Sequence, residues 1–414
     1  MKKVLLSILS LGMLGTASAQ VKDTVITGSG YLNQKFYSLS QDEKATMTAT
    51  SWHIAFAPNV MQANTAIRFN SLVGTVKVLP NADINAAITS VDTTGWAAEE
   101  TLYDNDADIL LGAFNQSGGT TQMDFSWGEY DVTTHNLKAA RTFGAKIGTA
   151  FYAIRFSLQS LAKIYTVTYF KLGETDSVSY NVNLNAYLTK NYVYSNLADQ
   201  SVLDLEPATA DWDLFFGQYY GDYQGIMMYK VAGVLNNLGT EVAKVIDNNP
   251  ATYSYTGTEQ FSTDNNVIHY NWKSSGPSGS SVADTIVYFV KAKNGAIWRL
   301  VFTGFVSGTG SGADAGSYIF DKELISSVGV ESVTSVFTEV YPNPANDMTQ
   351  VVVDAAANTT IEIYSLAGAK VYSTEVSGGL QTLQINTSDL NAGVYQVVVS
   401  SNGLKTAKKL MIQH

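Results

Sequence analysis

The sequence predicts a mainly β protein, with two tandem β-rich domains followed by a small Ig-like β-sandwich. Tyr, Val and Thr, which favour strands, are abundant, and tyrosines alone number 24 of the 414 residues. The segment 24–39 alternates apolar and polar residues with the period of two that strands show. Residues 340–414 contain short strand candidates separated by turn residues, as in a sandwich. A chain of this length is enough for about three domains.

The charge and the cysteine content of the chain exclude several classes of partner and site. The net charge is −11, which argues against a broad surface for nucleic acid or for an anionic membrane. The chain has no cysteine, so structural disulfides, thiolate metal sites and a cysteine nucleophile are excluded. We therefore expect neither a nucleic-acid partner nor a metal centre.

The N-terminus has the three parts of a secretory signal peptide. Lys2 and Lys3 form a positive region, residues 4–14 form an apolar run, and a small-residue site ends at Ala19. These features favour cleavage after Ala19 over a buried N-terminal helix. No other apolar run reaches the length of a membrane-spanning helix. The mature protein is therefore expected to be secreted or attached to the cell surface, without a transmembrane helix.

Two long segments resemble each other in the order of their landmarks. The motif Trp-x-Ile-x-Phe at 52–56 returns as Trp-x-Leu-x-Phe at 212–216, and aromatic strands follow later in each segment. In the first motif Trp52, Ile54 and Phe56 are expected to share one strand face. The alternative is a chance likeness among strands rich in Tyr, Trp and Val.

This self-similarity predicts the domain boundaries. The signal peptide occupies 1–19, and a Ser/Val-rich linker joins the second copy to the tail. The expected divisions are 20–185 for the first copy, 186–326 for the second copy, 327–339 for the linker and 340–414 for the tail.

Three further segments carry local predictions. Residues 231–247 have apolar side chains at helical spacing and are the best helix candidate, although Gly233 and Gly239 weaken a helix. Residues 274–281 and 307–316 are rich in Gly and Ser and are expected to be loops.

The tail combines regular strands with a set of short motifs. Its strand candidates lie at 351–353, 360–364, 370–372, 380–385, 393–399 and 408–412. The motif residues begin at the entry to the tail and continue to its final strand, and they are Tyr341, Pro342, Asn343, Pro344, Gly368, Gly393, Tyr395, Lys408 and Lys409.

This tail resembles the type A C-terminal sorting domain of Bacteroidetes type IX secretion cargo. The resemblance implies export first by the Sec route and then by the type IX secretion machinery, which would be a partner of the chain. It also implies removal of the tail and either release of the cargo or its attachment to lipopolysaccharide at the outer-membrane cell surface. The alternative is an ordinary C-terminal sandwich that binds another molecule.

Residues 20–325 resemble two copies of the HmuY-like family of secreted haemophores, on the basis of the repeated Trp motif and the late aromatic strands. That family implies a β-rich fold and haem bound through His or Met side chains from loops. The candidate ligands here are Met123, His135 and His269. The alternative for each His is a surface or hydrogen-bonded residue, and a Met is more often part of a core.

Other motifs of the sequence also have an ordinary structural interpretation. Asp104, Asp106 and Asp108 have the spacing of a calcium loop but lack its Gly and its final Glu, so a solvated acidic loop is expected. The motifs of a nucleophile elbow and of a phosphate-binding loop are absent from the sequence. Thr24, Ser177 and Thr285 each follow an Asp and precede an apolar residue. This pattern resembles the O-glycosylation sequon of exported Bacteroidetes proteins.

These observations predict a secreted or cell-surface binding protein without catalytic activity. The first hypothesis is a binder of haem or another flat apolar molecule. The second is an adhesion protein that presents tyrosine-rich faces to glycans or to other proteins. A hydrolase with an unrecognised site is the third.

Overall fold

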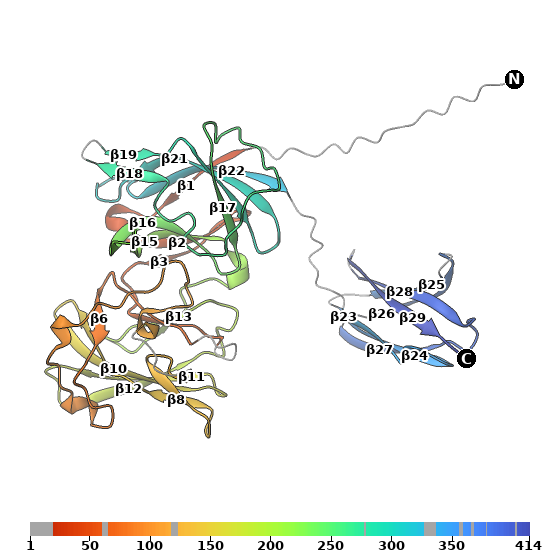
Figure 1. Cartoon of the computed structure of the whole chain (residues 1–414), viewed down its shortest axis with the longest axis horizontal. Coiled ribbons are helices and arrows are strands. Elements are labelled where there is room, and N and C mark those ends of the chain that lie inside the picture. The colour runs from red at the N-terminus through yellow and green to blue at the C-terminus, as the bar shows by residue number, and fades with distance from the viewer. Residues whose placement is uncertain are drawn as a thin grey trace. The chain divides into compact units, whose positions relative to one another are not determined.

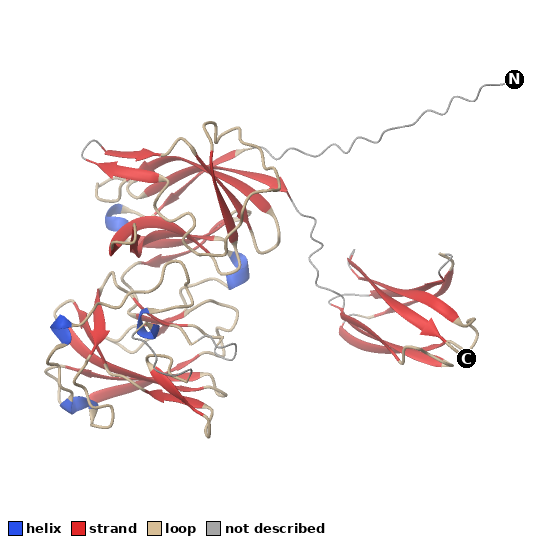
Figure 2. Cartoon of the chain, in the orientation of Figure 1, coloured by secondary structure: helices blue, strands red, loops and turns tan. Residues whose placement is uncertain are grey.

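The computed structural model describes residues 20–59, 65–116, 123–276, 279–326, 337–355, 359–365, 368–377, 379–401 and 404–414 (Figure 1). These residues form strands, turns and a few single-turn 3-10 helices, which confirms the predicted mainly β class (Figure 2). The predicted signal peptide, with Ala19, and residues 327–336 of the predicted linker lie outside the described residues.

The chain divides into two compact units near residue 326. Apart from the turn at 294–296, the described residues up to Ser326 form the first unit, and those from Phe337 onward belong to the second. The first unit contains two β-sandwiches, and the second is a single small sandwich.

The first sandwich of the first unit pairs a seven-stranded sheet with a four-stranded sheet. The seven-stranded sheet contains β6 (Gly74–Val78), β7 (Gly128–Asp131), β8 (Asn136–Ala139), β9 (Phe143–Ile147), β10 (Ala150–Gln159), β11 (Ile164–Lys171) and β12 (Ser177–Asn183). The four-stranded sheet has the order β14 (Val202–Leu203), β13 (Val193–Ser195), β4 (Ile54–Phe56) and β5 (Ile67–Phe69). Between them lies an aromatic core that includes Phe56, Phe114, Trp127, Phe156 and Tyr165.

The second sandwich has the same plan. Its five-stranded sheet has the order β1 (Val21–Ile26), β22 (Ser317–Ser326), β21 (Ile297–Val306), β20 (Ile286–Lys291) and β17 (Glu241–Ile246). Its four-stranded sheet has the order β16 (Met227–Asn236), β15 (Leu214–Tyr223), β2 (Asn33–Ser38) and β3 (Asp42–Thr48). The core between these sheets includes Phe216, Tyr288, Phe302, Tyr318 and Phe320.

The internal repeat is visible in equivalent contacts around the two marker tryptophans. Trp52 meets Tyr194 edge-on at 5.1 Å between ring centroids, and Trp212 meets Phe36 edge-on at 5.0 Å. The side-chain amide of Asn70 donates to the carbonyl of Trp52 at 2.9 Å. In the other sandwich the amide of Asn237 donates to the carbonyl of Trp212 at 2.6 Å.

The repeats exchange their first strands, so the expected boundary between residues 185 and 186 is wrong. β1 pairs with β22 and β2 pairs with β15, although β1 and β2 belong to the first copy in sequence. Reciprocally, β13 of the second copy pairs with β4 of the first copy. Backbone pairing therefore ties each copy to the other, and consecutive ranges cannot separate the two sandwiches.

The predicted common face of Trp52, Ile54 and Phe56 is confirmed for Ile54 and Phe56 and is wrong for Trp52. Trp52 precedes β4 and packs in the same cluster as Ala55, whereas Ile54 and Phe56 face the core of the first sandwich. All three residues of β4 are buried because this sheet is covered on both faces. Trp52 lies before the strand begins, so the alternation that puts Ile54 and Phe56 on one face does not extend to it.

Two local predictions fail because the segments pair as β-strands. Residues 231–247 form most of β16, a turn at Gly239 with φ 78° and β17, not a helix. Their backbone groups pair with β15 and β20. In the region 274–281, β18 (Lys273–Gly276) and β19 (Gly279–Val282) form a hairpin in place of the expected loop. The expected loop at 307–316 does separate β21 from β22.

The second unit confirms the expected small Ig-like sandwich. One sheet contains β23 (Phe337–Tyr341), β24 (Met348–Ala355) and β27 (Gly379–Asn386). The other contains β26 (Lys370–Val376), β25 (Thr359–Ser365), β28 (Gly393–Ser401) and β29 (Leu404–Ile412). All six predicted strands are present, and β23 is an additional strand that the sequence analysis missed.

The Asn-to-carbonyl contacts predict a large loss of stability on truncation. Asn237 is fully buried and donates to the carbonyls of Trp212 and Thr209. Asn237→Ala removes the side-chain donor to the Trp212 carbonyl and the acceptor of the buried Asn191 amide, whereas the Thr209 carbonyl keeps a hydrogen bond from Lys293. The substitution is expected to lower the free energy of unfolding by about 2–4 kcal/mol. Urea unfolding followed by tryptophan fluorescence measures the effect, since every tryptophan lies in the first unit.

Asn185→Ala is the matched control because the exposed Asn185 amide also donates to a backbone carbonyl, at 2.9 Å from Ala162. Its expected effect is within about 0.5 kcal/mol. Equal losses in Asn237→Ala and Asn185→Ala would contradict a supporting role for the buried amide.

Candidate functional site

The two four-stranded sheets of the first unit face each other across a third apolar layer. This layer contains Phe36, Met47, Trp52, Tyr194 and Trp212, together with smaller side chains from both sheets. Both inner sheets are therefore covered on each face, by a sandwich core on one side and by this central layer on the other.

A pocket with a cavity volume of about 80 Å³ lies in this layer. At ~10–15 Å³ for each water molecule, this is room for roughly five to eight waters. We call it the central pocket. Its lining consists of Gln34, Phe36, Met47, Trp52, Arg68, Phe69, Asn70, Ser71, Leu72, Asp104, Asp106, Ile109, Asn191, Tyr192, Tyr194, Glu206, Trp212, Phe215, Gln218, Tyr219, Tyr220, Leu235 and Asn236.

Buried polar atoms without a hydrogen-bond partner among the described residues mark this pocket. They include the indole nitrogens of Trp52 and Trp212, the hydroxyl of Tyr219 and the amide oxygens of Gln34 and Asn236. Each of these side chains is at least nine-tenths buried. A buried donor or acceptor that stays unpaired costs about 1–3 kcal/mol. Several such atoms around one cavity indicate a site that is completed by a bound molecule or by water.

Neighbouring hydrogen bonds fix which of these atoms accept. The Gln34 amide nitrogen donates to the carbonyl of Gln218 at 2.8 Å, so the Gln34 Oε1 atom is left as an acceptor. The Asn236 amide nitrogen donates to the carbonyl of Thr240 at 2.9 Å, which leaves the Asn236 Oδ1 atom as an acceptor. The pocket lining thus offers two indole donors, two amide acceptors and one hydroxyl that can do either.

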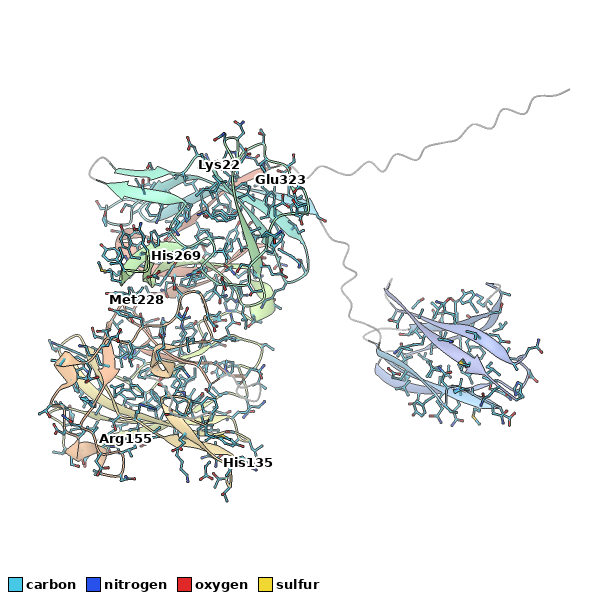
Figure 3. All side chains as sticks on the ribbon, in the orientation of Figure 1. Lys22, His135, Arg155, Met228, His269 and Glu323 are labelled. Atoms are coloured by element: carbon cyan, nitrogen blue, oxygen red, sulfur yellow. The ribbon has the colours of Figure 1, made fainter. Side chains whose placement is uncertain are left out.

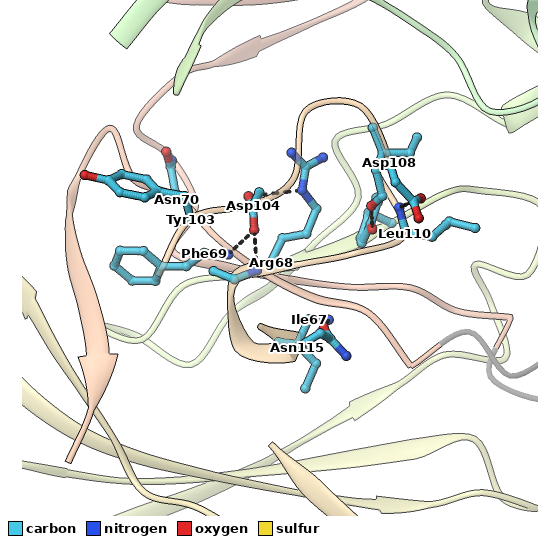
Figure 4. A network of polar contacts seen from close by, with 12 residues as sticks. Ile67, Arg68, Phe69, Asn70, Tyr103, Asp104, Asp108, Leu110 and Asn115 are labelled. Atoms are coloured by element: carbon cyan, nitrogen blue, oxygen red, sulfur yellow. Dashed lines mark hydrogen bonds and ion pairs between the residues drawn. The ribbon is translucent and has the colours of Figure 1, made fainter. Parts of the chain in front are cut away.

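Arg68 brings a cation to the pocket, and Asp104 balances its charge. Arg68 Nε lies 3.1 Å from Asp104 Oδ2 (Figure 4). The guanidinium also lies over the ring of Tyr192. Asp104 also accepts the backbone N–H of Phe69 and that of Ala113. Burial disfavours the cation, but the nearby carboxylate outweighs this effect and raises the Arg68 pKa above its ordinary value.

A second acidic residue of the lining is paired with a histidine. His269 Nε2 lies 2.9 Å from Asp106 Oδ2, and both side chains are buried. Burial acts to raise the Asp106 pKa, but the histidine contact and hydrogen bonds lower it overall. Gly221 makes room for this pair, because a Cβ at that position would lie 2.4 Å from His269 Nε2.

The prediction of a solvated acidic loop is therefore wrong for two of its three residues. Asp104 and Asp106 point inward and are paired with Arg68 and His269, and Asp108 alone is exposed. Their partners lie far away in sequence. In the described part of the chain, groups of three or more His, Asp or Glu that could hold a metal ion are absent.

Glu206 is a buried acid of the lining whose carboxylate is held by two hydrogen bonds. Its carboxylate accepts the backbone N–H of Asn191 at 2.9 Å and the hydroxyl of Tyr194 at 3.0 Å. Burial raises the pKa of Glu206 to about 7, because these hydrogen bonds and the charges of Arg68 and Lys190 only partly stabilise the anion. Glu206 thus changes charge near neutral pH.

The three side chains predicted as haem ligands lie at separate places in the first unit. His135 is in the turn between β7 and β8, where its Nδ1 lies 2.6 Å from the Tyr130 hydroxyl, and Met123 is exposed nearby. His269 lies beside β16 in the other sandwich, far from His135 (Figure 3). His269 contacts a residue of the central pocket, whereas Met123 and His135 are not part of its lining.

Most lining residues of the central pocket were not predicted from the sequence to be part of a site. The repeated Trp52 and Trp212 were recognised as structural landmarks, but their shared pocket was not. Their likeness could have hinted at a pair of equivalent positions. The sequence gives no means to see that the two copies face each other.

The predicted glycosylation residues differ in exposure. Thr24 and Ser177 are exposed and Thr285 is half-buried. An exposed hydroxyl is a requirement for modification, and the first two residues meet it. Modification itself stays a prediction.

Comparison with known families identifies the second unit. Residues 339–413 match the family model of the secretion system C-terminal sorting domain. The chain carries a type IX secretion sorting domain. It is therefore a secreted or cell-surface-attached protein that interacts with the type IX secretion machinery. No curated protein matches the chain. The resemblance of residues 20–325 to the HmuY-like family stays a prediction.

Several motif residues of the sorting domain connect its strands. Asn343, between two prolines, donates to the carbonyl of Lys409 at 2.6 Å and accepts the backbone N–H of Met411 at 2.8 Å. The Tyr395 hydroxyl donates to the carbonyl of Asn391, and Gly368 occupies a turn with φ 80°. Lys408 pairs with Glu339 at 3.0 Å. The described residues include no helix that is long and apolar enough to cross a membrane.

The raised pKa of Glu206 predicts a pH-dependent stability. Its ordinary value is 4.5 and its value in the fold is about 7, so between these pH values the native state binds more protons than the unfolded state. The free energy of unfolding is expected to fall as pH rises through this window, by up to about 3 kcal/mol from this group. Glu206→Gln keeps a neutral side chain and is expected to flatten this part of the profile, as measured by urea unfolding at pH 5, 6, 7 and 8.

The exposed Glu100→Gln serves as the control and should keep the profile of the unmodified protein. If the profiles of Glu206→Gln and of the unmodified protein run parallel from pH 5 to 8, then Glu206 does not titrate in this range.

Proposed function

We propose that the chain is an exported binding protein without catalytic activity, which holds one small molecule in the central pocket. The observation that carries this proposal is the set of buried, unpaired polar atoms around one cavity between the two repeats. Ligand pockets in proteins combine apolar and aromatic walls with a few placed polar groups. The aromatic lining and these polar atoms fit that description.

The geometry favours a ligand smaller than haem. The cavity has room for roughly five to eight waters, which is less than a haem macrocycle occupies. Haem also needs an axial His or Met in an apolar pocket. Met47 lies in the pocket lining, but the predicted ligands Met123, His135 and His269 do not. Haem binding therefore has less support than binding of a compact molecule with polar edges.

A nuclear magnetic resonance titration of the full chain tests the proposal through its indole N–H signals. Small neutral molecules, drawn from a fragment library that includes polyols, lactams and phenols, are added singly, with haem as a separate arm. Binding molecules are expected to shift the Trp52 and Trp212 signals, since these indoles lack a partner among the described residues. The signals of Trp96 and Trp127 should stay in place, because these indoles donate to backbone carbonyls at 2.9 Å.

Trp52→Phe and Trp212→Phe each remove an indole donor and keep an aromatic ring. Each substitution is expected to lower the affinity for a binding molecule by about two- to tenfold, which corresponds to the loss of one net hydrogen bond. Trp298→Phe is the control, because Trp298 is not part of the pocket lining. A library that leaves both pocket indoles unshifted at millimolar concentration would rule out the proposed site, and a haem-only response would favour the haemophore hypothesis.

The sorting domain predicts separable export and binding. A chain that ends at Ser326 lacks the second unit, including all residues matched to the sorting family. We expect it to stay inside the producing cells and still bind whichever fragment shifts the pocket indoles of the full chain, because the two units have separate cores. Cell fractionation with immunodetection measures the first effect. Export of the shortened chain at the normal level would contradict a sorting role for the tail.

A further inference from the structure

A row of aromatic side chains leads from the central pocket to an exposed hairpin. Tyr219 lines the pocket, and its ring centroid lies 5.7 Å from that of His269. The His269 ring lies 4.4 Å from Tyr270, and Tyr270 stacks on Tyr223 at 6.1 Å with only 12° between the ring planes. Tyr223 lies 5.9 Å from Tyr229. We call the last three residues, Tyr223, Tyr229 and Tyr270, the tyrosine row.

The outer part of this row is unusually apolar for a surface. Tyr229 is 56% exposed and Tyr223 is 38% exposed. They sit near the turn between β15 and β16, beside Ile226 and Met227, which are 71% and 56% exposed. A group of neighbouring exposed apolar side chains is typical of a surface that binds a partner. The tyrosines add hydroxyls at the edges of their rings, which suits a partner that is itself part apolar and part polar.

The charges around the pocket point to an uncharged ligand. Arg68 is balanced by Asp104 at 3.1 Å, and Asp106 lies 2.9 Å from His269. Burial favours the neutral form of Glu206, and Arg68 and Lys190 act on its anionic form, with Lys190 Nζ 2.6 Å from the Glu206 carbonyl oxygen. A charged ligand would lose its hydration here without gaining an unpaired opposite charge, which is costly.

The unpaired polar atoms are complementary to a ligand that both donates and accepts hydrogen bonds. The indoles of Trp52 and Trp212 need acceptors, and the amide oxygens of Gln34 and Asn236 need donors. Hydroxyl groups fill both roles with the same atom. A sugar ring carries several hydroxyls on its rim and apolar C–H groups on its faces, which can lie against aromatic rings. Its size also suits a cavity that holds roughly five to eight waters.

We propose that the ligand is a neutral glycan, with its terminal sugar residue in the central pocket and its next residues along the tyrosine row. This rests on the proposed function, because it assigns a ligand class to the same pocket. The row supplies aromatic rings that a free monosaccharide would not use: it is joined to the lining residue Tyr219 through the buried His269, and its outer members Tyr223 and Tyr229 are exposed. The surface location given by the sorting domain places such a site where glycans are accessible.

Defined sugars test the proposal on the full chain. Glucose, galactose, mannose and N-acetylglucosamine are titrated as monosaccharides and as their linear trisaccharides, with phenol and cyclohexanol as ring-sized controls. Indole N–H shifts of Trp52 and Trp212 report pocket binding, and calorimetry gives affinities. At least one sugar series is expected to shift both indoles, with the trisaccharide binding at least tenfold more tightly than its monosaccharide.

The double variant Tyr223→Ala with Tyr229→Ala separates the row from the pocket. It is expected to lower the affinity for the trisaccharide by about two- to tenfold for each tyrosine ring removed and to leave the affinity for the monosaccharide unchanged. Trp212→Phe should weaken both ligands. Tyr187→Ala, a half-buried tyrosine outside the pocket lining and the row, is the control.

The outcomes distinguish the two proposals. If phenol or cyclohexanol shifts the pocket indoles and every saccharide fails, the glycan proposal is overturned while the small-ligand function stands. Equal affinity for monosaccharide and trisaccharide, unaffected by the double variant, overturns the role of the tyrosine row and identifies a free-sugar site. If all these probes and the fragment library leave the indoles unshifted, both proposals fail.

Discussion

The fold of the first unit depends on burying both faces of its two inner sheets. Every residue of β4 and of β13 is buried, because each strand has a sandwich core on one side and the central layer on the other. A strand with no solvent face must be apolar throughout or must pair each polar group that it carries. Asn70 and Asn237 meet this demand by bonding the backbone near the tryptophans. Among the described residues, five of the nine buried side-chain atoms without a hydrogen-bond partner belong to the lining of the central pocket, which marks it as a candidate site.

The exchange of strands between the repeats keeps the inner sheets together. β2 completes the sheet of β15, and β13 completes the sheet of β4, so neither sandwich is made from one copy alone. The central pocket is built on these exchanged strands and combines side chains from both copies. Its geometry is therefore fixed by backbone pairing over most of the unit, and such preorganisation would lower the entropy lost on binding the proposed ligand.

The two halves of the pocket are related but not identical. Ile54 pairs with Phe69 in one sheet and Leu214 pairs with Asn236 in the other, so Phe69 and Asn236 occupy equivalent positions. By the same register Arg68 corresponds to Leu235. The copies thus share the marker tryptophans and differ where they line the cavity. An arrangement of this kind presents different polar groups on its two sides and suits a ligand without internal symmetry.

The sequence by itself determined the mainly β class, the landmarks of the repeat and the sorting domain, because strand composition, turn residues and short motifs are local properties. It could not determine the boundary at 185/186, the strands within 231–247 or the burial of Asp104 and Asp106. Each of these depends on partners that are remote in the chain, such as β20 for β17 and His269 for Asp106. The central pocket likewise depends on residues that are remote from each other in the chain. Its lining residues come together only when two sheets from different copies pack face to face, and no local pattern encodes that contact.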